Sequence, residues 1–362
     1  MNSTGKNIVV SFSGESHSEK ITTFIDGIKK GTAVSIEKIQ KDLEARNPKL
    51  FFNSQRQEND KIVLVSGISS GKATGEIIVC DVYNEYVDKK DYEKHEGFLR
   101  PSHADYTRLV KNRQNPSSGG GASSGRMTIP VVIAGSIAKQ ILLSKGVFII
   151  SHIQSVYNIS EENFTLENLG NFLQNKEKDL FFPTISSSFH ENCFNLLKTI
   201  QKEKDSVGGK IETAILNLSP GVGEPFFNSL ESEISRMLFS IPAVKAVEFG
   251  DGVEFVNKKG SEVEDSFYFD NKTQKIRTKE NHNGGINGGI SNGMPIIIKT
   301  SIKPVPTIKK PITSYNYLKK TQETVEFSGN YDVFVGNRAI PAVEGVIALA
   351  VLDSLYEEEK KV

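Results

Sequence analysis

The chain has 362 residues, of which 44 are basic and 44 acidic, so its formal net charge at pH 7 is zero. This balance excludes a general attraction to nucleic acid or to a membrane surface, so local arginines, lysines and backbone N–H groups must hold any anionic ligand. Hydrophobic residues make up 37% and charged residues 24%, a composition typical of a globular protein rather than a disordered one.

The two cysteines, Cys80 and Cys193, are far apart in the sequence and suggest neither a metal-binding pair nor a disulfide framework. They fit a reducing compartment. The first ten residues show no long apolar run behind a basic start, and we predict neither a signal peptide nor a transmembrane span. We therefore expect a cytoplasmic protein.

Apolar periodicity predicts strands and helices that come in groups. In chain order we predict strands over residues 7–13, 62–65 and 77–82, a helix over 131–143, a polar surface helix or loop over 161–179, a strand over 210–218, a helix over 227–239, a strand over 294–302 and a helix over 339–356. The absence of strict βαβ alternation favours an α+β architecture over a doubly wound sheet. No linker, compositional break or fixed-period repeat divides the sequence, so we expect a single domain over residues 1–362.

Four loops are rich in Gly, Ser, His or Arg in a way that packing does not explain. They are 14–17 after the first strand, 100–106, 117–126 before a helix, and 281–293 with two Gly-Gly pairs. Taken singly, each is also explained by a surface histidine, a turn with incidental charges, a flexible linker or a long turn between strands. Together they describe a site of backbone donors, two histidines and several arginines, which suits a phosphorylated, carboxylated small molecule and a flavin phosphate.

Two of these loops suggest specific chemistry. Asp105 could orient His103 and raise its pKa, or Arg100 could hold an anion. The three consecutive glycines at 119–121 let backbone N–H groups converge on a ligand oxygen, and the N-terminus of the following helix favours negative charge. The loop matches neither the P-loop pattern nor GxGxxG, so no nucleotide-binding fold follows from it.

The order of these motifs resembles the chorismate synthase family over nearly the whole chain. Residues 14–17 resemble GESHG, 55–60 QRxExD, 100–107 RPGHADYT, 119–128 GGGRSSARET, 205–209 DSVGG, 281–295 with 303–304 GGILGGISNG and KPTPS, and 332–341 RHDxxxxPRAVP. The resemblance implies a β-α-β sandwich, in which two antiparallel sheets flank a helical core, and a homotetramer. It also implies a lyase reaction, the 1,4-elimination of phosphate from 5-enolpyruvylshikimate 3-phosphate to give chorismate, with reduced FMN as cofactor.

The resemblance also assigns roles to individual residues. His17 would be the acid near the leaving phosphate, His103 would protonate the reduced flavin, and Asp332 would be the carboxylate near flavin N5. Ser16 and Ser124 would complete the proton relays. The substrate-binding residues implied are Arg46, Arg56, Arg126 and Arg338. The FMN-binding residues implied are Ala122, Ser123, Ser124, Pro242, Ala243, Gly288, Lys303, Pro304, Val305, Pro306, Thr307 and Asn330. We expect no metal, and the source of reduced flavin, a flavin reductase or an NADPH-linked reduction, stays open.

Several positions depart from the family pattern where it carries arginine. Ala45 would weaken substrate binding, and Ala122 and Asn330 would weaken FMN binding. Each replacement of an arginine removes a charged hydrogen bond, which contributes about 1.5–3 kcal/mol. Three readings follow. The chain is a working chorismate synthase, a paralogue that acts on a related cyclic phosphate or carboxylate, or a non-catalytic flavin-binding or scaffold subunit. Bound FMN without turnover would separate the second and third readings from the first.

Overall fold

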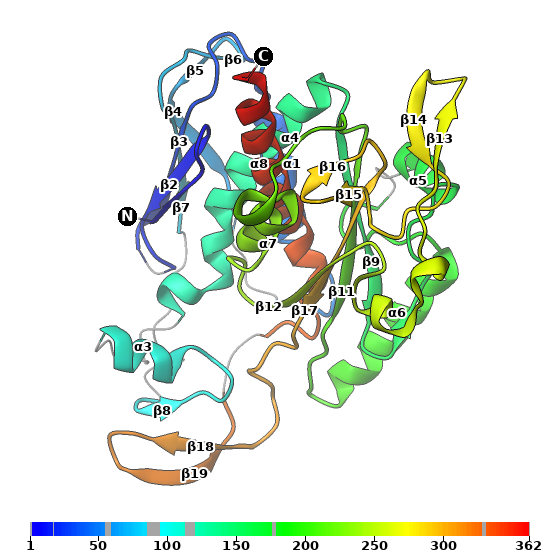
Figure 1. The fold of residues 1–362 in the computed structure, drawn as a ribbon. Coiled ribbons are helices and arrows are strands. Elements are labelled where there is room, and N and C mark those ends of the chain that lie inside the picture. Colours follow the sequence, from blue (N-terminus) through cyan, green and yellow to red (C-terminus); the bar gives the residue numbers. More distant parts are fainter. Residues whose placement is uncertain are drawn as a thin grey trace.

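The computed structural model describes residues 2–16, 18–54, 59–84, 95–112, 120–175, 179–327 and 331–361. Two five-stranded antiparallel sheets face each other across a layer of helices (Figure 1). The first sheet has the order β1 (Asn2–Thr4), β2 (Val9–Ser13), β3 (Lys20–Asp26), β7 (Ile78–Tyr83) and β4 (Ile62–Ser66). The second has the order β10 (Ile159–Ser160), β9 (Phe148–Val156), β11 (Gly209–Leu216), β17 (Ile296–Ile302) and β12 (Val244–Phe249).

The helical layer consists of α1 (Ile36–Arg46), α4 (Ile129–Ser144) and α8 (Gly336–Glu359), and α7 (Leu230–Leu238) packs against α8. Ile21 of the first sheet and Ile211 of the second belong to the same buried cluster as Ile133 of α4 and Val346 of α8. One hydrophobic core therefore joins both sheets through the helices, and the predicted β-α-β sandwich is confirmed.

The outer face of the second sheet is covered by α5 (Asn168–Asn175), with α6 (Ser187–Lys202) nearby, and has its own small apolar cluster. On this face His152 is fully buried, with Nδ1 2.7 Å from Glu161 and Nε2 2.9 Å from Glu212. Burial alone would lower the pKa of His152, but the two carboxylates outweigh it and raise that pKa. The ion pair fastens the 185–186 backbone to the sheet as well, since Glu161 also accepts the backbone N–H of Ile185 at 2.9 Å.

A small lobe extends below the sandwich in Figure 1. It contains α3 (Asp105–Asn112) and a three-stranded sheet of β8 (Phe98–Leu99), β18 (Ile312–Asn316) and β19 (Thr321–Val325). The remaining short elements are β5 (Ile68–Ser69), β6 (Lys72–Ala73), β13 (Phe267–Asp270), β14 (Lys275–Thr278), β15 (Ile286–Asn287), β16 (Ile290–Ser291) and the 3-10 turns η2 (Gly121–Ser123), η3 (Gly125–Thr128), η4 (Phe226–Asn228), η5 (Gly252–Asn257) and η6 (Gly260–Glu262).

Two helical segments, Gly125–Ser144 and Gly336–Glu359, are long and apolar enough to cross a membrane by length and composition. In each of them 72% of the most apolar window is buried inside the protein. Their hydrophobicity is therefore explained by the sandwich, in which they are the central helices.

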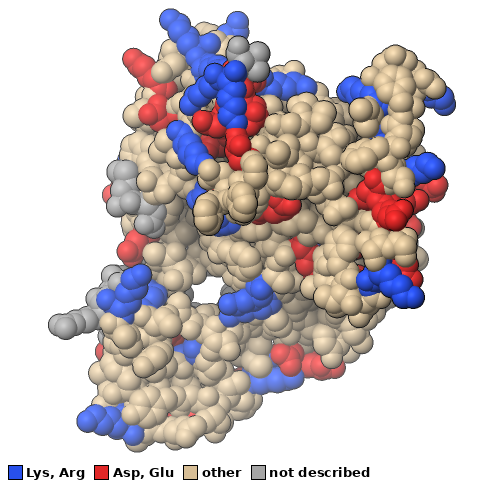
Figure 2. All heavy atoms as spheres, viewed as in Figure 1, with Lys and Arg blue, Asp and Glu red and all other residues tan. Residues whose placement is uncertain are grey.

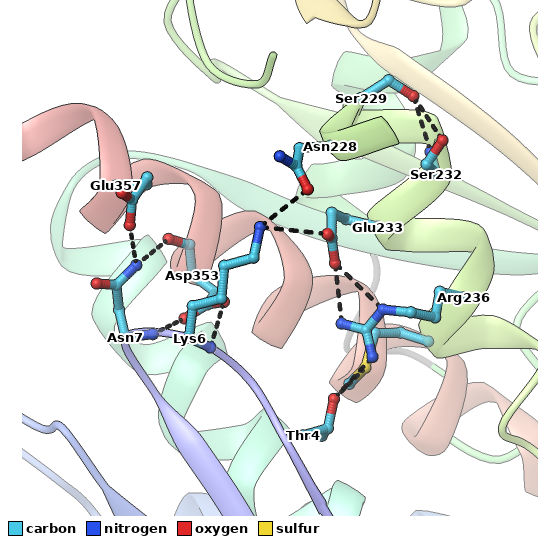
Figure 3. Close-up of polar contacts among 11 residues, drawn as sticks. Thr4, Lys6, Asn7, Asn228, Ser229, Ser232, Glu233, Arg236, Asp353 and Glu357 are labelled. Atoms are coloured by element: carbon cyan, nitrogen blue, oxygen red, sulfur yellow. Dashed lines mark hydrogen bonds and ion pairs between the residues drawn. The ribbon is translucent and has the colours of Figure 1, made fainter. Parts of the chain in front are cut away.

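The first sheet is tied to the end of α8 (Figure 3). The Asp353 carboxylate accepts the backbone N–H groups of Lys6, Asn7 and Ile8 at 2.6–2.9 Å. The Asn7 side chain also donates to the Asp353 carbonyl at 3.0 Å and to Glu357 at 2.9 Å. A hollow of about 290 Å³ lies beside these contacts, but its charged groups are largely engaged with one another, so it is not our candidate active site.

The central helices α4 and α8 approach most closely at a pair of glycines. A Cβ atom on Gly135 would lie only 2.1 Å from the Cα of Gly345, a distance that no real side chain adopts. Next to this contact, the Lys139 ammonium reaches Asp42 of α1 at 2.9 Å and Glu344 of α8 at 3.0 Å. Burial alone would lower the pKa of Lys139, but the two carboxylates raise it. The ion pairs thus join all three helices.

We predict that Gly135→Ala destabilises the fold strongly. The new methyl group meets backbone atoms of α8, which cannot move aside as a flexible side chain would, and overpacking of this kind costs about 1–3 kcal/mol. Gly170→Ala is the matched control, because the exposed Gly170 lies in α5 with open space around it. It should be neutral or stabilising by up to about 1 kcal/mol. Urea unfolding of both variants measures the difference, and equal stabilities would contradict the close contact.

Candidate active site

A cleft of about 780 Å³ lies where the central helices begin. It is lined by residues that precede and open α4 and α8, by the loop before β12 and by the segment that follows β17. In Figure 2 the surface is hollowed in this region, between the main body and the lobe that carries β18. Its volume falls within the range of about 300–1,000 Å³ that is typical of small-molecule sites.

Most of the predicted site residues meet in this cleft. The lining includes Ser16, Arg46, His103, Ala122, Ser123, Ser124, Arg126, Pro242, Ala243, Lys303, Val305, Pro306, Asp332 and Arg338. Three predicted residues, His17, Arg56 and Asn330, lie outside the described residues, as do residues 117–119 of the glycine-rich loop. Pro304 and Thr307 flank lining residues, and Thr307 contacts His103 directly.

Two of the predicted substrate arginines share one buried carboxylate. Arg126 Nη1 lies 2.8 Å from Asp60 Oδ1, and Arg46 Nη2 pairs with the other oxygen of Asp60. Burial would raise the pKa of Asp60, but the two guanidinium groups outweigh it and lower that pKa. Asp60 therefore stays ionised and holds both guanidinium groups in place. Asp60 belongs to the motif at residues 55–60, but the motif alone did not indicate this role.

Arg338 is held by the protein on three sides. Its Nη1 lies 3.0 Å from both oxygens of Asp332, its Nε donates to the Arg46 carbonyl at 3.1 Å, and its Nη2 donates to Asn47 at 3.2 Å. Arg338 belongs to the first turn of α8, and Asp332 lies just before that helix. This network fixes both side chains at the rim of the cleft.

His103 is paired differently from the prediction. Its Nε2 contacts the Thr307 hydroxyl, and the nearby Lys303 donates to the Ser102 carbonyl at 2.7 Å. Burial, followed by the positive charges of Arg100 and Lys303, lowers the pKa of His103 to about 4. Asp105 is bound by Arg100 through two hydrogen bonds of 2.8 and 2.7 Å. The charge of Asp105 does act to raise the pKa of His103, as predicted, but burial and the two cations outweigh it.

Two polar atoms at the cleft are buried and have no hydrogen-bond partner among the described residues. They are the Ser16 hydroxyl and the Arg46 Nε. Buried polar groups are almost always hydrogen-bonded, so these two donors are available to a ligand that enters the cleft. The donors around them, two arginines and a hydroxyl, suit an anionic group such as a phosphate or carboxylate. The residues present therefore fit a flavin phosphate or an anionic substrate.

Ala45 does not face the cleft. It lines a separate hollow of about 460 Å³ together with Lys139 and Phe148, whereas its neighbour Arg46 lines the cleft. Successive residues of a helix point about 100° apart, which explains why the two diverge. The expectation that Ala45 weakens the grip on substrate was therefore wrong. Ala122, by contrast, does lie in the cleft.

Gly288 is also placed elsewhere. It lies in the turn between β15 and β16, and the neighbouring Gly289 carbonyl accepts the backbone N–H of Leu230, the first residue of α7. The lining of the cleft includes no residue of the 281–293 loop. The expectation that this loop and residues 117–126 approach one ligand is therefore not met within the described part of a single chain.

The whole chain is similar to known proteins of one family. The family model described as chorismate synthase matches residues 8–356. A chorismate synthase of Methanocaldococcus jannaschii is 37% identical over 367 residues, which cover 99% of this chain and 97% of the relative. One of Methanococcus aeolicus is 36% identical over 365 residues, with 98% and 96% covered.

The chain belongs to the chorismate synthase family. A solved structure described as a crystal structure of chorismate synthase superposes with a TM-score of 0.77 and covers 98% of this chain and 93% of the other. Its sequence identity is 23%, so it supports the shared fold alone. The resemblance inferred from the motifs is confirmed.

We predict that the His103 ring titrates with a midpoint near 4, because burial and two neighbouring cations oppose its protonation. NMR titration of the ring protons would measure this midpoint. Lys303→Met should raise it, because the substitution removes one of those cations. A midpoint of 6 or higher in the unmodified protein would contradict the enclosed environment.

We predict that Asp60→Asn lowers stability by about 3–5 kcal/mol, because it leaves two buried guanidinium groups without their carboxylate. Inorganic phosphate should restore more stability to this variant than to the unmodified protein, since an anion can replace the lost charge. Asp205→Asn is the control, because the Asp205–Lys310 pair is exposed and such pairs contribute about 0–1 kcal/mol. Thermal melts with and without phosphate test this, and an Asp60 variant as stable as the control would contradict it.

Proposed function

We propose that this protein is a working chorismate synthase that eliminates phosphate from 5-enolpyruvylshikimate 3-phosphate with the help of reduced FMN. The main support is one cleft that combines the Arg46–Asp60–Arg126 cluster with His103 and Asp332. Family membership supports the same reaction. The loss of arginines at Ala122 and Asn330 favours weaker FMN binding rather than loss of the site.

Arg46 and Arg126 are proposed to bind the anionic groups of the substrate. Asp60 fixes both guanidinium groups in place, so little conformational freedom is lost when an anion arrives. Guanidinium groups bind phosphate and carboxylate through paired hydrogen bonds. The unpartnered Nε of Arg46 and the Ser16 hydroxyl supply further donors at the same place.

The FMN is proposed to lie against residues Ala122 to Ser124, Pro242, Ala243 and the segment from Lys303 to Thr307. When bound, reduced FMN supplies electron density that eases the departure of phosphate. The chain itself contributes Lys303 and the turn residues Ala122 to Ser124, which line the cleft; Gly121 beside them has φ +50°, a conformation that glycine adopts readily.

His103 is proposed to handle a proton at the flavin. In the ligand-free cleft its low pKa keeps the ring neutral at pH 7. A bound anion would offset the charges of Arg100 and Lys303 and so raise the pKa of His103 toward its ordinary value. Ligand binding would thus prepare His103 to carry the proton. The proposed role of His17 as the acid near phosphate stays a prediction.

We further propose a cytoplasmic homotetramer of single-domain subunits, as the family resemblance implies. One buried cluster runs from Ile8 to Tyr356, which supports a single domain. Phe226 and Phe227 are 88% and 93% exposed, which suits burial against another subunit. Light scattering of the purified protein measures its mass in solution.

The deciding experiment is an anaerobic assay with reduced FMN and 5-enolpyruvylshikimate 3-phosphate. We expect chorismate and stoichiometric phosphate, and Asp332→Asn should lower turnover by about 10²–10⁴-fold if its carboxylate takes part in proton transfer. FMN binding without phosphate release would favour the paralogue. Failure to bind FMN at all would favour the scaffold subunit.

A further inference from the structure

Two buried asparagines lie just behind the cleft. Asn53 and Asn337 are 3% and 2% exposed, and their side-chain amides bond to each other in both directions. Asn53 Nδ2 donates to Asn337 Oδ1 at 3.2 Å, and Asn337 Nδ2 donates to Asn53 Oδ1 at 3.0 Å. The pair joins the segment after α1 to the first turn of α8.

One amide of this pair contacts Asp332, which lines the cleft. Asn53 Nδ2 also donates to Asp332 Oδ1 at 3.3 Å and to the Phe334 carbonyl at 3.1 Å, so its two N–H groups serve three acceptors. The backbone N–H of Ser54 donates to the same Asp332 oxygen at 2.9 Å. Residues 53 and 54 therefore hold one carboxylate oxygen from the protein side.

Through Asp332 the pair also acts on Arg338. The two oxygens of Asp332 both lie 3.0 Å from Arg338 Nη1, and Arg338 follows Asn337 directly in the first turn of α8. A shift of the Asp332 carboxylate would remove the acceptor that orients this guanidinium. The orientation of both charged groups at the cleft thus depends on the amide pair.

The pair rests on a rigid support. Phe52, which precedes Asn53, is 1% exposed and meets Phe182 and Phe194 edge-to-face at 5.7 and 5.6 Å between ring centroids. The Phe52 carbonyl accepts the backbone N–H of Val333 at 2.8 Å. The aromatic cluster and this bond lock the 52–54 segment against the 332–334 segment.

We propose that Asn53 and Asn337 are positioning residues that fix the Asp332 carboxylate, and through it Arg338, in the geometry that catalysis requires. The inference rests on the role proposed above for Asp332. Packing alone does not explain the pair, because two apolar side chains of similar shape would fill the space without burying four polar groups. Buried groups that hold catalytic side chains in place are what a precise site needs.

The test is the double variant Asn53→Leu/Asn337→Leu, assayed with reduced FMN and 5-enolpyruvylshikimate 3-phosphate. Removing both amides together leaves neither amide unsatisfied by the other, but the Phe334 and Phe181 carbonyls each lose a donor, so we expect a moderate loss of stability with the fold retained. We expect kcat/KM to fall about ten- to hundredfold, since a small misplacement of a catalytic group has effects of that size.

A double-mutant cycle separates positioning from general structure. In an Asp332→Asn background the two leucines should cause little further loss, because the carboxylate they misplace is already gone. Equal losses in both backgrounds would overturn the inference and assign the pair a structural role only. Unchanged kcat/KM in the double leucine variant would also overturn the inference. If Asp332→Asn is impaired in the same assay, the proposed function still stands. Full activity of Asp332→Asn would refute the role of Asp332 itself, and the inference with it.

Asn7→Leu is the matched control at the far end of α8. It removes an amide that bonds to Asp353 and Glu357 (Figure 3), and none of these three residues lines the cleft. It should lower thermal stability and leave kcat and KM unchanged. If the double leucine variant does not fold, Asn337→Ser removes the amide that exchanges two hydrogen bonds with Asn53 and also donates to the Phe181 carbonyl. Asn337→Ser should lower kcat/KM severalfold in the unmodified background and should cause no further loss in the Asp332→Asn background. Unchanged activity in the unmodified background would overturn the inference.

Discussion

The close approach of α4 and α8 at Gly135 and Gly345 is the constraint on which the remaining structure depends. Only glycine at Gly135 allows the two backbones to come this near. Because the N-terminal ends of both helices line the cleft, the distance between the helices sets the distance between Arg126 and Arg338. A packing feature in the centre of the sandwich thus determines the spacing of charged groups at its edge.

The cleft shows how a chain of zero net charge builds a site for an anion. It places two guanidinium groups on one buried carboxylate, so the site is preorganised before a ligand binds. Asp332 and Arg338 form a second, neutral unit beside it. Most of the cationic side chains at the cleft are therefore already held by the protein, and binding need not order them.

The sequence predicted the central helices well, because α4 and α8 are apolar on most sides and their residues have no other environment to occupy. It missed β9, where polar His152 interrupts the apolar pattern and is buried only because Glu212 lies opposite on β11. It also missed α1, α6 and β3. Within the site, motif resemblance found the lining residues but not their pairing. Because Asp105 is near His103 in the sequence, we expected the two to pair. In the structure the Asp105 carboxylate instead binds Arg100 through two hydrogen bonds.

The bonds from Asp353 to Lys6, Asn7 and Ile8 have a consequence for biosynthesis. A ribosome makes the chain from its N-terminus, so the first sheet emerges long before the helix that covers it. Ile21, Ile25 and Val82 belong to the buried core shared with α8 and lack that cover until Asp353 has been synthesised. The apolar face of the nascent first sheet therefore stays without its cover until the last helix has left the exit tunnel.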